Sequence, residues 1–318
     1  MAKAKRIKGI KCNDAAAAGI RLVLTTRFEE MFDFQEAALD FSDPEGVHSM
    51  RVASRRLRSA MRDFMPYIRK RGLASLLKQT KSIASALGEV RDQDVAIAAL
   101  EKIEKRAPAE ASAALKQLIE TRKAARDEAR KRLKSALVPT HMKQLRTEFI
   151  AGIDGATPLR KTPARNNAPV TYIKMSADVI GERLKELEAL SNSLYKPFEV
   201  ESLHEMRIAA KRFRYALELF QQCWGRALTG YAKSAAQMQK ALGDLHDCDI
   251  WIDSIGEQVN EARKKKHDDQ IEGLIWLLSH FVKLRTKHLR QAYDLWREWE
   301  AKDLGDQLRQ TFQSPASE

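Results

Sequence analysis

The sequence of 318 residues is long enough for one large or two ordinary domains with sizeable cores. Its formal net charge of +13 at pH 7, from 56 Lys and Arg against 43 Asp and Glu, favours an anionic polymer or surface as partner. The sequence contains no window of about 18 uncharged apolar residues, which excludes a membrane-spanning helix, and no CxxC pair of the kind that binds zinc.

The first segment, residues 1–13, is basic but does not lead into the unbroken apolar run of a signal peptide. Arg21 and Arg27 follow the alanines at 15–18 too closely for such a run. We therefore expect a basic N-terminal segment and a cytoplasmic protein.

Helix is the expected state nearly throughout, because Ala, Leu, Lys, Arg and Glu are abundant while the chain holds only 14 Gly and 9 Pro. Before the middle of the chain, the apolar periodicity predicts helices over 14–40, 45–67, 73–103 and 108–146. Beyond it, the periodicity predicts helices over 169–192, 202–223, 227–260 and 264–300.

The middle segment, residues 151–168, predicts a linker, because Gly152, Gly155, Pro158 and Pro163 are incompatible with a continuous helix. It separates a first half, residues 14–150, from a second half, residues 169–300. The last residues, 301–318, lose apolar periodicity and predict a loose tail.

An internal repeat relates the two halves. The segment VHSMRVASRRLRSAMRDF, residues 47–64, matches LHEMRIAAKRFRYALELF, residues 203–220, at an offset of 156 residues. A second pair, LGEVRDQDV from Leu87 and LGDLHDCDI from Leu242, follows at an offset of 155. Such matching predicts an all-α fold of two pseudo-symmetric four-helix bundles that arose by duplication.

Each repeat carries a row of basic side chains with helical spacing, opposite an apolar face such as Met50, Leu57 and Phe64. In the first repeat the row is His48, Arg51, Arg55, Arg58 and Arg62. In the second repeat the row is His204, Arg207, Lys211 and Arg214. Like charges three or four residues apart destabilise a helix. Because this local cost recurs in register in both repeats, it predicts anion binding rather than a solvated surface.

The start of the first basic helix has the signs of an anion site. Asp43 and Pro44 predict an N-cap followed by proline in the first turn. Backbone N–H groups at a helix start attract oxyanions, so His48 and its counterpart His204 are expected near bound anion.

The second repeated block, LGxxxDxD, offers carboxylates that could bind a metal or orient the arginines. Because so many guanidinium groups lie nearby in the sequence, we expect these aspartates to orient arginines. They are Asp92, Asp94, Asp247 and Asp249. The glycines of the block, Gly88 and Gly243, predict a close helix crossing.

Two other functions stay open. Glu45-x-x-His48 and Glu201-x-x-His204 have the spacing used in di-iron helical bundles, which would make the protein a metal-dependent enzyme, although adjacent arginines would repel a cation. Nucleic-acid binding also fits the charge, but aromatic residues are 7% of the sequence and do not interleave with the basic rows.

The quoted segments resemble the CHAD family, the conserved histidine α-helical domain, over about residues 14–300. The resemblance implies two four-helix bundles around a basic central cavity that binds inorganic polyphosphate, often at polyphosphate granules. It implies no hydrolysis, because the sequence lacks the Glu-x-Glu-x-Lys motif of the triphosphatase domain that many members carry. No catalytic residue, cofactor or metal site is therefore expected.

Carried over by position, the family's basic lining corresponds to His48, Arg51, Arg55, Arg56 and Arg58 with His204, Arg207, Lys211, Arg212 and Arg214. We add Arg27 and Arg183, which align with each other at the repeat offset. His246 stands where the first block has Arg91, so the two ends of the cavity are expected to differ.

Overall fold

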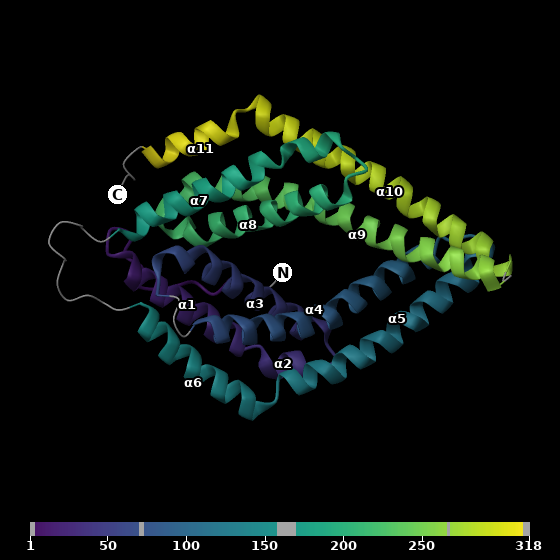
Figure 1. The fold of residues 1–318 in the computed structure, drawn as a ribbon, viewed down its shortest axis with the longest axis horizontal. Coiled ribbons are helices and arrows are strands. Elements are labelled where there is room, and N and C mark those ends of the chain that lie inside the picture. Colours follow the sequence, from purple (N-terminus) through teal and green to yellow (C-terminus); the bar gives the residue numbers. More distant parts are fainter. Residues whose placement is uncertain (1–3, 70–72, 158–169, 266–267, 314–318) are drawn as a thin grey trace. The chain divides into compact units, whose positions relative to one another are not determined.

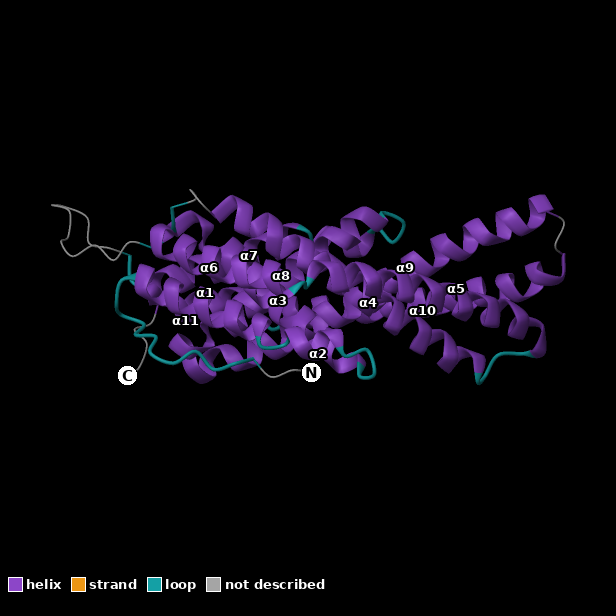
Figure 2. Ribbon diagram, turned by 90° about the horizontal axis from the view of Figure 1, so that it is seen from below, coloured by secondary structure: helices purple, strands orange, loops and turns teal. Residues whose placement is uncertain are grey.

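The computed structural model describes residues 4–69, 73–157, 170–265 and 268–313. Figure 2 shows these residues as helices joined by loops, with no strand among them beyond an isolated bridge between Ala15 and Thr171. The predicted all-α fold class is therefore confirmed. Within the described residues, no helix has both the length and the apolar character that a membrane span needs.

The chain divides into two compact units. Unit 1 comprises Met1–Leu100 and Ile119–Ser176, and unit 2 comprises Glu101–Leu118 and Ala177–Glu318. This division differs from the predicted halves, because residues 101–118 belong to unit 2 and residues 170–176 belong to unit 1.

The helices that supply unit 1 begin at Ala16, and the unit's core contains the stacked rings of Phe28 and Phe149, whose centroids are 4.0 Å apart. These elements are α1 (Ala16–Phe32), α2 (Gln35–Leu39), α3 (Pro44–Phe64), η1 (Met65–Tyr67), α4 (Leu73–Glu104), α5 (Ala109–Ala136) and α6 (Pro139–Ala156). The distal end of α4 and the beginning of α5 pass into unit 2.

Unit 2 is built around the long helix α9, against which α8 and α10 pack (Figure 1). Its elements are α7 (Tyr172–Ala189) from Ala177 onward, η2 (Ser191–Tyr195), α8 (Val200–Trp224), η3 (Gly225–Leu228), α9 (Thr229–Lys265), α10 (Asp268–Ala301) and α11 (Leu304–Gln313). Gly273 on α10 meets α5 so closely that a Cβ there would lie 2.6 Å from the Glu110 carbonyl oxygen.

Two predicted helices are each divided in the structure. The predicted helix 108–146 ends at Ala136, and α6 begins at Pro139. Proline lacks the N–H that a helix interior requires but suits the first helical turn, so it begins α6. The predicted helix 14–40 is interrupted between Phe32 and Gln35.

Helices α6 and α11 extend into the segments predicted to be a linker and a tail. Helix α6 continues through Gly152 and Gly155 to Ala156, so the first residues of the expected linker are helical, and residues 158–168 lie outside the described residues. The expected tail contains α11, because its Leu308 is buried and its Phe312 ring lies 4.8 Å from that of Trp224. The expected loss of apolar periodicity is wrong for this segment, because Leu304, Leu308 and Phe312 follow one another at helical spacing.

The start of α3 matches the prediction closely. Asp43 caps the helix by accepting a hydrogen bond of 2.9 Å from the Glu45 amide, and Pro44 occupies the first turn. Gly46 follows at a point where α2 passes so near that a Cβ would overlap the Ala37 carbonyl oxygen. The cap and this close contact fix the direction in which α3 leaves the loop.

Candidate functional site

The basic row of α3 is half-buried along one side of the helix, whereas Met50, Leu57 and Phe64 on the other side are fully buried. The α3 stripe comprises His48, Arg51, Arg55, Arg56, Arg58 and Arg62. Burial lowers the pKa of Arg58, yet an arginine stays charged because its ordinary pKa is so high. The buried apolar face thus packs α3 against the core of unit 1, and the cations of the α3 stripe remain partly exposed to solvent.

The first turns of the α3 stripe meet α4. Arg51 Nη2 donates to Asp92 Oδ1 at 2.9 Å, and the pKa of His48 is lowered by burial and then by the charge of Arg91. A Cβ at Gly88 would be 3.8 Å from Arg51 Nε, an ordinary contact, and nothing lies within 4 Å of a Cβ at Gly243. The predicted close helix crossing at these glycines is wrong, because no backbone of another helix lies near either one. Gly88 faces an arginine side chain, and Gly243 faces open space.

A buried glutamate joins two arginines in unit 1. Glu30 Oε2 accepts from Arg27 Nη1 at 2.6 Å, and Glu30 Oε1 lies 3.3 Å from Arg56 Nη1. Arg27 Nη1 also donates to the Lys5 carbonyl at 2.9 Å, and the Glu30 side chain is only 5% exposed. Arg27 is therefore held in the core of unit 1, and its guanidinium is committed to protein partners.

The same arrangement recurs in unit 2 at the repeat offset of 156 residues. Glu186 pairs with Arg183, and its second oxygen lies 3.5 Å from Arg212 Nη1. Here the glutamate is 30% exposed and Arg212 is 35% exposed. This second triad is more open than the first, so Arg212 can approach an anion more easily than Arg56.

These glutamates are the residues that a di-iron centre would need beside the two Glu-x-x-His motifs. Each is instead engaged by two guanidinium groups, and Glu45 and Glu201 are exposed. Across the described residues, no group of three or more His, Cys, Asp or Glu side chains is placed to bind a metal ion. The alternative of a metal-dependent enzyme finds no ligand set in this geometry.

The basic row of α8 comprises His204, Arg207, Lys211, Arg212 and Arg214, all half-buried. Two side chains hold Arg214, because its Nε donates to Gln239 Oε1 at 2.7 Å and its Nη1 donates to Glu218 Oε1 at 2.9 Å. Its guanidinium also lies 4.7 Å from the centre of the Tyr215 ring. Unlike the α3 helix, α8 starts without a side-chain cap at Glu199.

Two histidines meet at the start of the α8 stripe. His204 Nδ1 lies 3.2 Å from His246 Nδ1 of α9, and the ring centroids are 4.2 Å apart. Burial, then the charges of Arg207, His204 and Lys211, lower the pKa of His246 to about 4. Burial and Arg207 also lower the pKa of His204. The pair is therefore neutral near pH 7.

The four aspartates of the second block divide into two kinds. Asp92 and Asp247 are exposed, and Asp92 bonds Arg51 of the stripe. Asp94 and Asp249 point inward, where Asp94 lies 3.8 Å from Arg126 Nη1 and Asp249 accepts a hydrogen bond from Arg285 Nε. Burial raises the pKa of Asp94 despite three neighbouring arginines.

Sequence reasoning missed a further basic row on α5. Arg122, Arg126 and Arg130 are half-buried in unit 1, and the Arg130 guanidinium lies 4.9 Å from the centre of the Phe41 ring. Their four-residue spacing was a visible signal. At the offset of 155 residues that relates the second blocks, the matching positions hold Leu277, Phe281 and Arg285, so only Arg130 has a basic counterpart.

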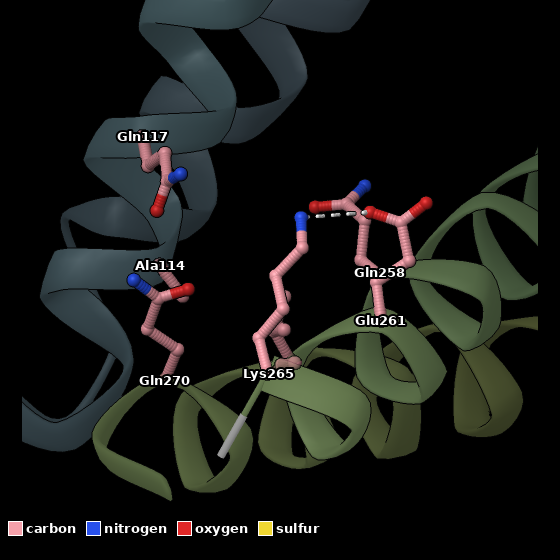
Figure 3. Close-up of a pocket in the computed structure, with 8 residues that line it drawn as sticks. Ala114, Gln117, Gln258, Glu261, Lys265 and Gln270 are labelled. Atoms are coloured by element: carbon pink, nitrogen blue, oxygen red, sulfur yellow. Dashed lines mark ion pairs between the residues drawn. The ribbon is translucent and has the colours of Figure 1, made fainter. Parts of the chain in front are cut away.

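A polar hollow in unit 2 lies at the end of α9 and uses none of the predicted binding residues. It has a volume of about 190 Å³, and Figure 3 shows Gln117, Gln258 and Gln270 around it. Lys265 and Glu261 form an ion pair of 3.8 Å at its rim. Its mixed charges and amides do not form a cationic surface.

The repeated basic helices are the features on which a family assignment can be tested. The profile of the CHAD domain matches residues 22–256, most of the chain. The chain belongs to the CHAD domain family. Polyphosphate binding is the association known for CHAD domains, which are generally binding proteins rather than conventional enzymes.

Two solved structures share the CHAD fold of this chain. The crystal structure of the CHAD domain from the plant Ricinus communis matches with a TM-score of 0.67 and 22% identity, covering 98% of this chain and 97% of that one. PptA from Streptomyces chartreusis matches with a TM-score of 0.66 and 13% identity, covering 89% and 100%. No curated protein matches the sequence of this chain.

Proposed function

We propose that this CHAD protein binds inorganic polyphosphate through the stripes of α3 and α8. The observation that carries the proposal is the recurrence of half-buried cations, at matching positions, on one helix of each unit. A chain of phosphates can contact many fixed cations at once and release its counterions, so affinity grows with chain length. Arginine suits this role because its planar fork pairs with two phosphate oxygens.

Family membership supports the same ligand, since polyphosphate binding is the association known for CHAD domains. We further propose that the two bundles derive from one duplicated unit, a view that the matching Arg–Glu–Arg triads support. The central cavity shared by both stripes, implied by the family resemblance, remains part of this proposal. So does a cytoplasmic location at polyphosphate granules.

The structure favours some of the predicted ligands over others. Arg27 is committed to Glu30 and Lys5, and Arg214 to Gln239 and Glu218, so these two contribute mainly by holding their neighbours. We expect the phosphate contacts among the other half-buried cations of the stripes, Arg51, Arg55, Arg58, Arg207, Lys211 and Arg212.

A competition experiment tests the proposal. Labelled long-chain polyphosphate is bound to the protein at one fixed ionic strength and displaced with unlabelled polyphosphate, orthophosphate, duplex DNA or single-stranded RNA. We expect long polyphosphate to compete best and orthophosphate to fail, because a single phosphate gains no avidity. Equal or better competition by a nucleic acid would replace polyphosphate with that nucleic acid as the ligand.

We propose binding without turnover. Incubation with polyphosphate, tripolyphosphate or ATP in the presence of Mg²⁺ should release no orthophosphate above a protein-free blank. Sustained release that scales with protein concentration would contradict a role limited to binding.

A further inference from the structure

The imidazoles of His204 and His246 form a hydrogen-bonded pair inside the α8 site, with their Nδ1 atoms 3.2 Å apart. One nitrogen of such a bond must accept, so at least one ring is neutral while the bond exists. At the matching positions unit 1 has His48 and Arg91, a combination that cannot form this pair. The two units therefore differ in how many groups near their stripes can gain a proton.

Cations dominate the surroundings of the pair. Arg207 and Lys211 of α8 lower the pKa of both rings, and Glu201 and Glu205 of the same helix act in the opposite direction on His204 alone. The η2 segment, which packs on α8, has the uncharged sequence SNSLY.

Several charged groups of α9 and α10 pair with one another or with backbone carbonyls. Lys240 bonds Asp244 at 2.5 Å, and His288 Nδ1 lies 3.9 Å from the same carboxylate. Arg285 bonds Asp249 and the Pro197 carbonyl. Asp247 is exposed on α9. Burial and the cations of α8 therefore dominate at the pair.

We propose that a polyphosphate chain bound along α8 causes both imidazoles of this pair to take up protons, which makes the affinity of unit 2 dependent on pH. The inference rests on the proposed function and specifies how that site is regulated. Each ring takes one proton from solvent, the Nδ1–Nδ1 hydrogen bond breaks, and both rings can then donate to phosphate oxygens.

The size of the electrostatic effect is sufficient for this change. One phosphate charge at about 4 Å, at an effective dielectric constant of about 20, raises the pKa of an imidazole by about 3. The pKa of His246, which is about 4 in the free protein, then rises to near neutral in the complex. Because the bound state has the higher pKa, affinity increases as pH falls from the bound-state pKa towards the free-state pKa, and it is constant above that window.

Calorimetric titration of the full chain with polyphosphate of one defined length tests this coupling. Binding is measured from pH 5.5 to 8.0 at constant ionic strength, in two buffers of different ionisation enthalpy. For the wild-type protein we expect net proton uptake and an affinity on the order of twentyfold higher at pH 5.5 than at pH 7.5 from His246 alone.

Three variants separate the pair from other titrating groups. His246→Gln should lose the proton that His246 takes up and should show a weaker pH dependence. His246→Arg, which introduces the residue found at the matching position of unit 1, should bind tightly at pH 7.5 with a flatter profile. His141→Gln, on the exposed surface of α6, should keep the wild-type profile. Titration of His48 and of the polyphosphate ends is common to all variants, so differences between them report on the pair.

The protonation state of the pair can also be measured directly in the wild-type protein, so the test does not depend on the variants folding. In wild-type protein with labelled histidines, the ring resonances of the pair should change from neutral to protonated on adding polyphosphate at pH 6.5. Rings that stay neutral in the saturated complex, or a pH profile that His246→Gln leaves unchanged, would overturn the coupling while leaving polyphosphate binding intact. Absence of binding at every pH would overturn the proposed function and this inference together.

Discussion

In unit 1 the carboxylate of Glu30 is 5% exposed and joins Arg27 to Arg56, whereas in unit 2 the matching carboxylate of Glu186 is 30% exposed. At the other end of each stripe, unit 1 sets His48 beside the permanent charge of Arg91, and unit 2 sets His204 against the titratable ring of His246. One sequence pattern, kept in register, is therefore structural and permanently charged in unit 1 but open and titratable in unit 2.

The largest difference between the units should appear in stability. Glu30→Gln should lower the free energy of unfolding by about 3–5 kcal/mol, because it leaves two buried guanidinium groups without a counter-charge. Glu186→Gln, in the more exposed triad, should cost about 1 kcal/mol or less. Urea denaturation followed by circular dichroism measures both losses, with Glu120→Gln in an exposed ion pair as the control. Equal losses would show that the two triads are equivalent despite their different exposure.

The second effect concerns polyphosphate affinity. The double reversal Arg55→Glu with Lys211→Glu, one change on each stripe, should weaken binding on the order of a hundredfold, because it removes two cations and adds two repulsive charges. Each single reversal should have a smaller effect. Fluorescence titration with labelled polyphosphate measures the affinities. The reversals Lys131→Glu and Lys302→Glu, at exposed positions, control for the change in net charge.

The salt dependence of binding compares the two stripes further. Replacing Arg55, Arg58, Lys211 and Arg214 by Ala should reduce the slope of log affinity against log salt by something of order one unit per lost phosphate contact. The α3 pair should account for more of this change than the α8 pair, because Arg214 already bonds Gln239 and Glu218. An unchanged affinity and slope in a folded quadruple variant would show that the stripes are only solvated surface.

The smallest difference lies at the helix starts. Asp43→Ala should lower stability by about 1 kcal/mol, because the Glu45 amide loses its acceptor. Glu199→Ala at the start of α8 should have almost no effect, since its side chain makes no capping bond. Thermal denaturation of the two variants measures the contrast. A larger loss for Glu199→Ala would reverse this part of the comparison.

Local sequence signals predicted the helices and the arrangement of much of the candidate binding surface. The Asp43 cap, the apolar face of Met50, Leu57 and Phe64, and the cations of α3 all follow from short-range spacing, and the structure places them together. Errors arose where a single residue or a short helical pattern was overlooked. Pro139 starts a new helix inside a continuous periodic segment, and the four-residue spacing of Leu304, Leu308 and Phe312 already indicated α11.

The partners within the candidate site could not be predicted, because they join residues far apart in the sequence. Arg27 and Glu30 have a helical spacing that signals an ion pair, but the approach of Arg56 depends on how α1 packs against α3. His204 and His246 are 42 residues apart, and only the packing of α8 on α9 brings their rings together. The sequence showed that His246 replaces Arg91 at the matching position, but it did not show that His246 would contact His204.

The return of the chain to unit 1 after residue 169 limits how this protein can be dissected. Tyr172 is buried with its ring against Gly19, and its amide donates to the Asp14 carbonyl at 2.9 Å. A cut at the middle of the chain would remove this ring from unit 1 and would equally take residues 101–118 away from unit 2. Fragments produced by such a cut should be soluble and well folded only when expressed together, which makes the protein suited to a fragment complementation assay.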